Sequence, residues 1–191
     1  MNALPKPTSI NCFLESLDRP LAAFATNNVV SAQPAFSAES PRILLRIGQL
    51  IMTVVPEGPD SHLLEFSSLL EGESLSIKAE LSLPLTEAVA PAAPYQHVLS
   101  TDTSGRPLGG TLCNTCHGGE ERVTGIDFAM AFSSVAFQPN PSREVPLEKL
   151  AQAQKSCDAQ RQPERCAMLG ALFAHGPIVR AAFPDTMAIF F

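Results

Sequence analysis

The chain has 191 residues, of which 45% are hydrophobic and 17% are charged, so it is long enough to bury a core and too apolar to remain disordered. Its net charge is −6 and its 13 lysines and arginines are scattered, which argues against a nucleic-acid-binding protein. No apolar stretch approaches the length of a membrane span, and the 17 prolines predict many short elements joined by ordered loops.

The first expected element is a short helix over residues 10–17, with Ser9 or Asn11 as its cap. A short polar side chain at such a position can accept a hydrogen bond from a free amide in the first helical turn. The short apolar run over residues 21–25 is better explained as a strand than as part of a targeting segment.

From residue 20 to residue 84 the sequence is typical of β structure. Residues 42–47 and 50–55 are rich in branched aliphatic side chains and are separated by Gly48-Gln49. A glycine at the first position of a two-residue loop favours a tight hairpin, so we expect these two runs to pair as antiparallel strands.

The clearest strand pattern covers residues 74–83, where apolar and polar residues alternate without exception. Such alternation is typical of a strand with one face on a core and the other in water. We expect the odd positions to be buried and the even ones to face solvent, the odd set being Leu75, Ile77, Ala79, Leu81 and Leu83 and the even set Ser76, Lys78, Glu80 and Ser82. Several strands at this spacing predict a small sandwich or an open barrel.

Residues 84–110 contain four prolines and resemble a linker, interrupted by a possible strand over residues 95–99. Further along, the pattern becomes helical. Pro146 fits the first position of one helix, and Pro163 opens a second that ends before Gly176-Pro177.

Taken together, these elements predict an α+β protein. We expect residues 1–95 to form an antiparallel β-rich domain, either sandwich-like or an open barrel. We expect residues 96–191 to form a smaller, mostly helical region, either as a second domain or as part of one composite domain.

Five consecutive residues, Cys113-Asn114-Thr115-Cys116-His117, carry the strongest chemical signal in the chain. Two cysteines three positions apart, followed at once by histidine, form the pattern by which haem is covalently attached. The spacing suits this chemistry because two thiols can add to the two vinyl groups on one edge of the porphyrin, while the next imidazole reaches the iron.

Two other interpretations of this cysteine pair remain open. The pair could form a structural disulfide or remain as idle thiols. It could also be half of a zinc site completed by Cys157 and Cys166, although the gap of about forty residues between the pairs is long for a zinc ribbon.

The remaining cysteines favour a structural role. Cys157 and Cys166 bracket a polar loop between the two expected helices, so a disulfide that closes this helical hairpin is the simplest interpretation. Closing a loop of this size stabilises a protein by roughly 2–3 kcal/mol. Cys12 is then left as a free thiol.

If iron is bound by His117, its second axial ligand has several candidates. Met187 and His97 rank level and first, and His175 follows them. The other candidates are His62, Met130 and Met168. A five-coordinate iron, suited to gas sensing or peroxide chemistry, is also compatible with the sequence.

With this motif, two following helices and a methionine near the end, residues 105–191 resemble a c-type cytochrome. The resemblance implies that Cys113 and Cys116 form thioether bonds to haem c and that His117 ligates the iron. The chain departs from the usual small cytochrome in lacking an amphipathic helix before the motif and a clear closing helix, and in placing its β-rich segment first.

The sequence therefore predicts an extracytoplasmic monohaem protein of electron transfer or haem binding, in the periplasm, the cell envelope or secreted, rather than an enzyme. No signal peptide is visible, so we expect the chain to be a mature form. The redox partner and the oligomeric state are not indicated. The alternatives are a secreted β-rich interaction module with structural disulfides and no haem, and a protein with a structural zinc site.

Overall fold

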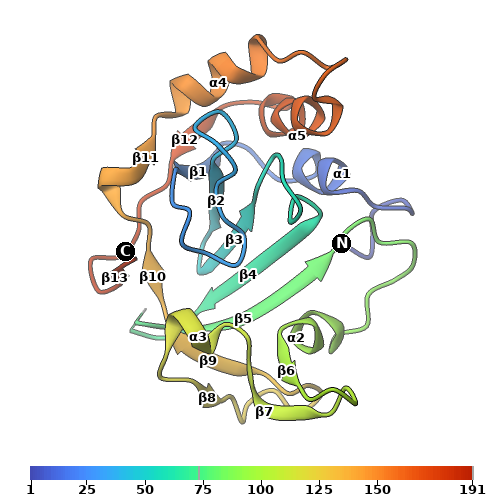
Figure 1. Cartoon of the computed structure of the whole chain (residues 1–191), viewed down its shortest axis with the longest axis vertical. Coiled ribbons are helices and arrows are strands. Elements are labelled where there is room, and N and C mark those ends of the chain that lie inside the picture. Colours follow the sequence, from blue (N-terminus) through green and yellow to red (C-terminus); the bar gives the residue numbers. More distant parts are fainter. Residues whose placement is uncertain (73, 191) are drawn as a thin grey trace.

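The computed structural model describes residues 1–72 and 74–190, and its central feature within those residues is a curled nine-stranded sheet (Figure 1). The strand order is β11-β1-β2-β3-β4-β5-β9-β8, and β12 pairs with β1 in parallel. The strands are β1 (Leu21–Thr26), β2 (Arg42–Ile47), β3 (Leu50–Val54), β4 (Leu63–Leu69), β5 (Leu75–Ser82), β8 (Glu121–Arg122), β9 (Phe132–Val135), β11 (Glu144–Val145) and β12 (Ile178–Arg180).

The remaining elements are short and lie around this sheet. Two small ribbons pair β6 with β7 in antiparallel fashion and β10 with β13 in parallel. Their bounds are β6 (Leu99–Thr101), β7 (Pro107–Thr111), β10 (Phe137–Gln138) and β13 (Ala188–Ile189). The helices are α1 (Ile10–Glu15), α2 (Ala93–His97), α3 (Asn114–His117), α4 (Leu147–Lys155) and α5 (Pro163–Phe173), with a 3-10 turn η1 (Pro141–Arg143).

The expected α+β fold with a mostly helical second region is wrong. Strands make up 30% of the chain and helices 20%, and residues after 96 contribute β8, β9, β11 and β12 to the large sheet. These strands have two to four residues each, too few to show a period of two in the sequence. They pair because the edges of β5 and β1 leave backbone amides and carbonyls that need partners.

Several local expectations are confirmed. The β2–β3 hairpin turns at Gly48, which has a φ of 59°. Helix α1 is capped by Ser9, whose Oγ accepts a hydrogen bond from the amide of Cys12 at 3.1 Å. Helix α5 begins at Pro163 and α4 begins directly after Pro146. The strand expected at residues 95–99 is wrong, because this segment forms α2, which packs against β5.

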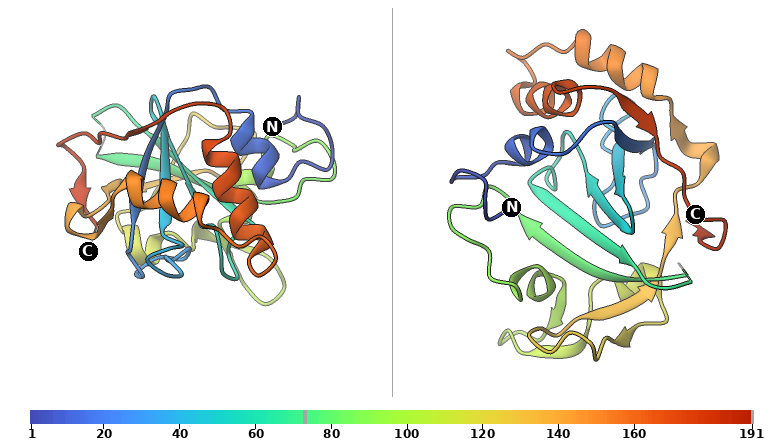
Figure 2. Two further views of the ribbon diagram at one scale, coloured as in Figure 1. Left: turned by 90° about the horizontal axis from the view of Figure 1, so that it is seen from above. Right: turned by 180° about the vertical axis from the view of Figure 1, so that it is seen from behind.

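The main hydrophobic core lies on one face of the sheet, beneath α1, α4 and α5 (Figure 2). Helix α5 packs against both other helices. Leu45, Val54 and Leu64 from the strands meet Leu14 and Leu169 from the helices, and all five are completely buried. Fully burying a leucine contributes about 1.5–3 kcal/mol, so this face supplies much of the driving force for folding.

The opposite face of the same strands carries charged and polar side chains as well as an apolar cluster that includes Leu44 and Ile51. Residues paired across neighbouring strands share a face, and Leu44, Thr53, Glu65 and Glu80 form one such row across β2 to β5. The next row contains Ser67 paired with Lys78. This face does not carry the three helices and is the floor of the pocket described below.

The predicted exposure of the even positions in β5 is wrong, because Ser76 and Lys78 are buried and Glu80 and Ser82 are half-buried. Ser76 is 0% exposed and Lys78 is 5% exposed, whereas Leu75 and Ile77 are only half-buried. At the other end of the pattern, Leu81 and Leu83 are buried in the core, as predicted. The even face of β5 meets little solvent because it forms part of the pocket, where Lys78 and Glu80 lie among lining residues from other segments.

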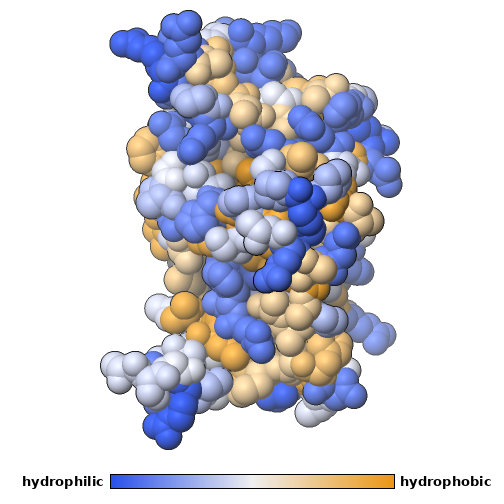
Figure 3. Space-filling view, turned by 90° about the vertical axis from the view of Figure 1, so that its right-hand side faces the viewer, coloured by the Kyte–Doolittle hydropathy of each residue, from blue (hydrophilic) through white to orange (hydrophobic). Residues whose placement is uncertain are grey.

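Large exposed apolar side chains are spread over several loops and strands, Val29 being the most exposed of them, followed by Leu108 and Leu112. On the side drawn in Figure 3, hydrophobic and hydrophilic residues are interspersed. Among the described residues, no helix combines the length and the apolar character needed to cross a membrane.

Candidate functional site

A pocket lies over the polar face of the sheet. Its cavity volume is about 200 Å³, which is below the range of about 300–1,000 Å³ for cofactor and ligand pockets. The sheet forms its floor, and its walls come from residues 26–32, from His97 and Val98, and from residues 112–117. All three residues expected to attach haem, Cys113, Cys116 and His117, line this pocket.

The helical turn α3 explains how the motif reaches the pocket. Cys113 is its cap residue, and the amides of Cys116 and His117 both donate to the carbonyl of Cys113, at 3.2 and 3.0 Å. Residues three and four apart on a helical turn lie on the same side, so the two thiols and the imidazole are presented together. Both cysteines are free thiols, Cys113 half-buried and Cys116 exposed.

The His117 ring is held in a defined orientation. Its Nδ1 lies 2.7 Å from the carbonyl oxygen of Val135, and because a carbonyl can only accept, Nδ1 carries the proton and donates. The rings of Phe137 and Phe190 lie next to it, with centroids 5.2 and 6.1 Å from its own. The unprotonated Nε2 is thereby available as a metal ligand, in the arrangement by which protein carbonyls orient ligating histidines.

Electrostatics also keep His117 neutral. Burial, followed by the positive charge of Lys78, lowers the pKa of His117 to about 4. At neutral pH the imidazole therefore carries no extra proton that a metal would have to displace. Burial raises the pKa of the neighbouring Cys113 thiol.

Glu120 braces the loop that leads into the motif. One oxygen of its carboxylate accepts a hydrogen bond from the amide of Thr111 at 2.7 Å, and the other accepts one from the Thr111 hydroxyl. The Thr111 hydroxyl in turn accepts from the amide of Cys113 at 3.2 Å. Gly110 lies so close that a Cβ there would be 2.7 Å from the Glu120 carboxylate. These contacts fix the backbone at the first cysteine.

Glu80 and Lys78 of β5 also line the pocket, and Glu80 contacts His97, the last residue of α2. His97 lies on the wall, with its Nδ1 2.8 Å from a carboxylate oxygen of Glu80. Burial raises the pKa of Glu80, while the hydrogen bond from His97 acts in the opposite direction. A carboxylate that accepts from Nδ1 leaves the Nε2 of His97 as a possible ligand atom, and the side chain of His97 is 43% exposed.

Lys78 is the second of these β5 residues. Its Nζ donates to the hydroxyls of Ser76 and Ser67 at 2.6 and 3.1 Å and lies 3.5 Å from the Val135 carbonyl oxygen. Burial lowers the pKa of Lys78 to about 8.

The structure separates the candidates for a second axial ligand. His97 lines the pocket, whereas Met187 is 3% exposed in a second apolar cluster with Leu44, Ile51, Leu69 and Ala136 and is not among the pocket-lining residues. The other candidates do not line the pocket either: His62 and His175 are exposed, Met168 is in the main core, and Met130 lines a separate depression.

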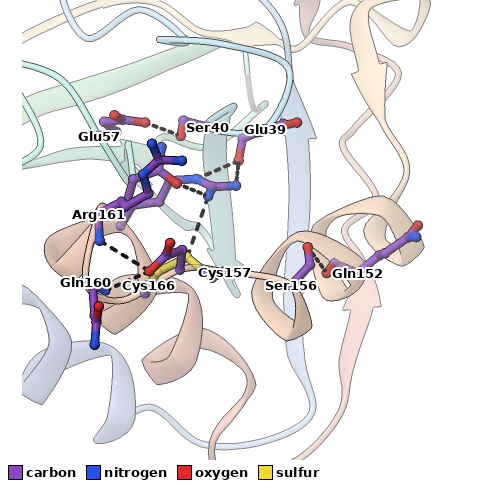
Figure 4. The surroundings of a disulfide bond; sticks show 12 residues. Glu39, Ser40, Glu57, Gln152, Ser156, Cys157, Gln160, Arg161 and Cys166 are labelled. Carbon is purple, nitrogen blue, oxygen red and sulfur yellow. Dashed lines mark hydrogen bonds between the residues drawn. A yellow bond between two sulfur atoms is a disulfide. The ribbon is translucent and has the colours of Figure 1, made fainter.

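The predicted disulfide between Cys157 and Cys166 is confirmed, with Cα atoms 5.5 Å apart (Figure 4). It joins the segment after α4 to the first turn of α5. Arg165 lies beside it, 4% exposed, and donates to the carbonyl of Glu39 at 2.8 Å. Because both sulfurs are bonded to each other, they are not available to complete a zinc site with Cys113 and Cys116.

Sequence reasoning missed Glu80, Lys78 and Glu120 as parts of the site. Glu120 stands beside the motif, where a solvated charge is the commoner interpretation. Glu80 and Lys78 sit at even positions of an alternating strand, and that alternation is the same whether the polar face meets water or a polar pocket.

Comparisons of this chain with protein-family models, with curated proteins and with solved structures find no match.

Proposed function

We propose that this chain is a monohaem c-type protein of electron transfer, which holds haem c in the pocket between the sheet and the motif. The observation that carries the proposal is the position of His117 on the pocket wall, with Nδ1 donating to Val135 and Nε2 left to bind iron. When bound, haem supplies a one-electron iron couple, whose potential the protein sets through axial ligands, burial and hydrogen bonds.

The residues present fit the group. Cys113 and Cys116 are unbonded thiols on the same wall as His117, and no disulfide removes them from reaction. The pocket floor is partly apolar, with Leu44 and Ile51 between the polar side chains. The rings of Phe137 and Phe190 lie beside the imidazole.

We further propose that His97, rather than Met187, is the second axial ligand. His97 is on the pocket wall and Glu80 orients its ring, whereas Met187 is packed in an apolar cluster. Since thioether attachment takes place outside the cytoplasm in the proteins that this motif resembles, an extracytoplasmic location belongs to the same proposal, as does a redox partner protein.

The test is the ultraviolet–visible spectrum of the protein produced in a host with haem-attachment machinery. We expect the spectrum of a six-coordinate, low-spin haem c. His97→Ala should convert it to a high-spin form, and Met187→Leu, which keeps the size of an apolar side chain, should leave it unchanged. A protein without a haem spectrum would contradict the function, and it would favour the alternative of a β-rich interaction module. The opposite response of the two variants would contradict the ligand assignment.

A further inference from the structure

Lys78 is a buried cation with neutral partners. Its Nζ contacts three oxygens, two of them serine hydroxyls and one the carbonyl of Val135, and none of these carries a charge. The Glu65 carboxylate acts on Lys78 only through space and is itself paired with Arg42 at 2.6 Å. Burying an ammonium without a carboxylate partner is expensive. A lysine that remains there despite this cost calls for a functional explanation.

The Val135 carbonyl connects Lys78 to the motif. The same oxygen accepts the hydrogen bond from Nδ1 of His117 at 2.7 Å and has Nζ of Lys78 at 3.5 Å. A positive charge next to a carbonyl oxygen draws electron density from it and makes it a poorer acceptor. The His117 N–H is then polarised less, and the imidazole donates less electron density through Nε2.

We propose that Lys78 is a positioning residue that raises the reduction potential of the iron held by His117, by placing an ammonium on the carbonyl that accepts the His117 N–H. This inference rests on the proposed haem attachment. A weaker imidazole donor stabilises the ferric state less, and a nearby positive charge disfavours the more positive ferric centre. The weaker imidazole donor and the nearby positive charge both raise the reduction potential. Burial lowers the pKa of Lys78 only to about 8, so the amine is mostly protonated at pH 7.

The hydroxyls of Ser67 and Ser76 keep the ammonium in place. Ser67 donates to Ser76 at 2.7 Å, which leaves lone pairs of both oxygens for the Lys78 amine. These serines lie on β4 and β5 on the same face of the sheet, so the cation is fixed by the sheet rather than by a mobile loop.

The experiment compares the reduction potentials of haem-loaded variants at pH 7 by spectroelectrochemical titration. Lys78→Met and Lys78→Gln remove the charge and keep an extended side chain, while Lys78→Arg keeps the charge. Lys149→Met, at an exposed position of α4, is the matched control. We expect both neutral variants to lower the equilibrium constant for reduction roughly tenfold, which is about 59 mV for one electron. Lys78→Arg should stay close to the wild-type potential, and the control Lys149→Met should have the wild-type potential.

Three results would overturn the inference: wild-type potentials in the haem-loaded neutral variants, a potential in Lys78→Arg as low as in Lys78→Met, or loss of haem from the neutral variants alone. The last result would assign Lys78 to haem attachment instead. A wild-type protein that lacks haem would refute the proposed function itself, which is a different outcome from an unchanged potential.

Discussion

On the face of the sheet covered by α1, α4 and α5, the strands present aliphatic side chains such as Leu45 and Leu64, which are completely buried. On the opposite face the same strands present Glu65, Lys78 and Glu80 around a pocket. Alternate residues of one set of strands thus build the main core on one face and line the pocket on the other. Each strand therefore has two roles. The side chains on one face stabilise the fold by burial, and those on the other face place polar groups in the pocket.

Two adjacent leucines of β2 offer the strongest test of this difference. Leu45 is 0% exposed in the helix-covered core, and Leu44 is 9% exposed on the pocket face. We expect Leu45→Ala to lower the free energy of unfolding by about 3–5 kcal/mol, because it leaves a closed cavity. Leu44→Ala should cost about 2 kcal/mol or less, since it enlarges a pocket that is already open. Urea denaturation measures both, and equal losses would contradict the assignment of the two faces.

A second test concerns pH, because the pocket wall carries a neutral, half-buried histidine, His117. The pKa of His117 is lowered from 6.5 to about 4 in the folded chain. As the pH falls from about 6.5 to about 4, the unfolded chain therefore binds a proton that the folded chain does not, and stability is lost over this window. The loss is at most about 3 kcal/mol.

The measurement is the pH dependence of urea melts of the haem-free polypeptide, produced without attachment machinery. His117→Gln should remove most of the slope between pH 6.5 and 4, because glutamine does not titrate. An identical slope in the variant would show that other groups dominate and that His117 is not held neutral in the pocket.

The smallest expected effect concerns the carboxylate that braces the motif. Glu120→Gln replaces one of the two acceptor oxygens bonded to Thr111 by an amide nitrogen, which should cost about 1 kcal/mol and reduce the fraction of chains that carry haem. Glu121→Gln, at the exposed neighbouring residue, is the control and should change neither value. Urea melts and the haem-to-protein ratio provide the readouts, and equal behaviour of the two variants would exclude the bracing role.

How far the sequence could predict this molecule depends on the range of the interactions involved. The β2–β3 hairpin, α1, α5 and the Cys157–Cys166 disulfide follow from neighbouring residues and were predicted. Strand β9 pairs with the edge of β5, which lies more than fifty residues earlier in the chain, and β8 pairs with β9. No local sequence pattern predicts these two short strands.

The same distinction applies to the site. The sequence identified Cys113, Cys116 and His117 from their spacing, and the structure brings all three to one pocket. It could not show that Val135 would accept the His117 N–H or that Glu80 would face His97, since these contacts cross between elements distant in the chain.

The most direct test of the central claim is the mass of the denatured, purified protein from a host with haem-attachment machinery, because thioether bonds survive unfolding. We predict the mass of the polypeptide with one haem added, and the mass of the polypeptide alone for the double variant Cys113→Ser, Cys116→Ser. Cys12→Ser, which removes the other free thiol, should retain the haem mass. A wild-type chain with the mass of the bare polypeptide would contradict the account.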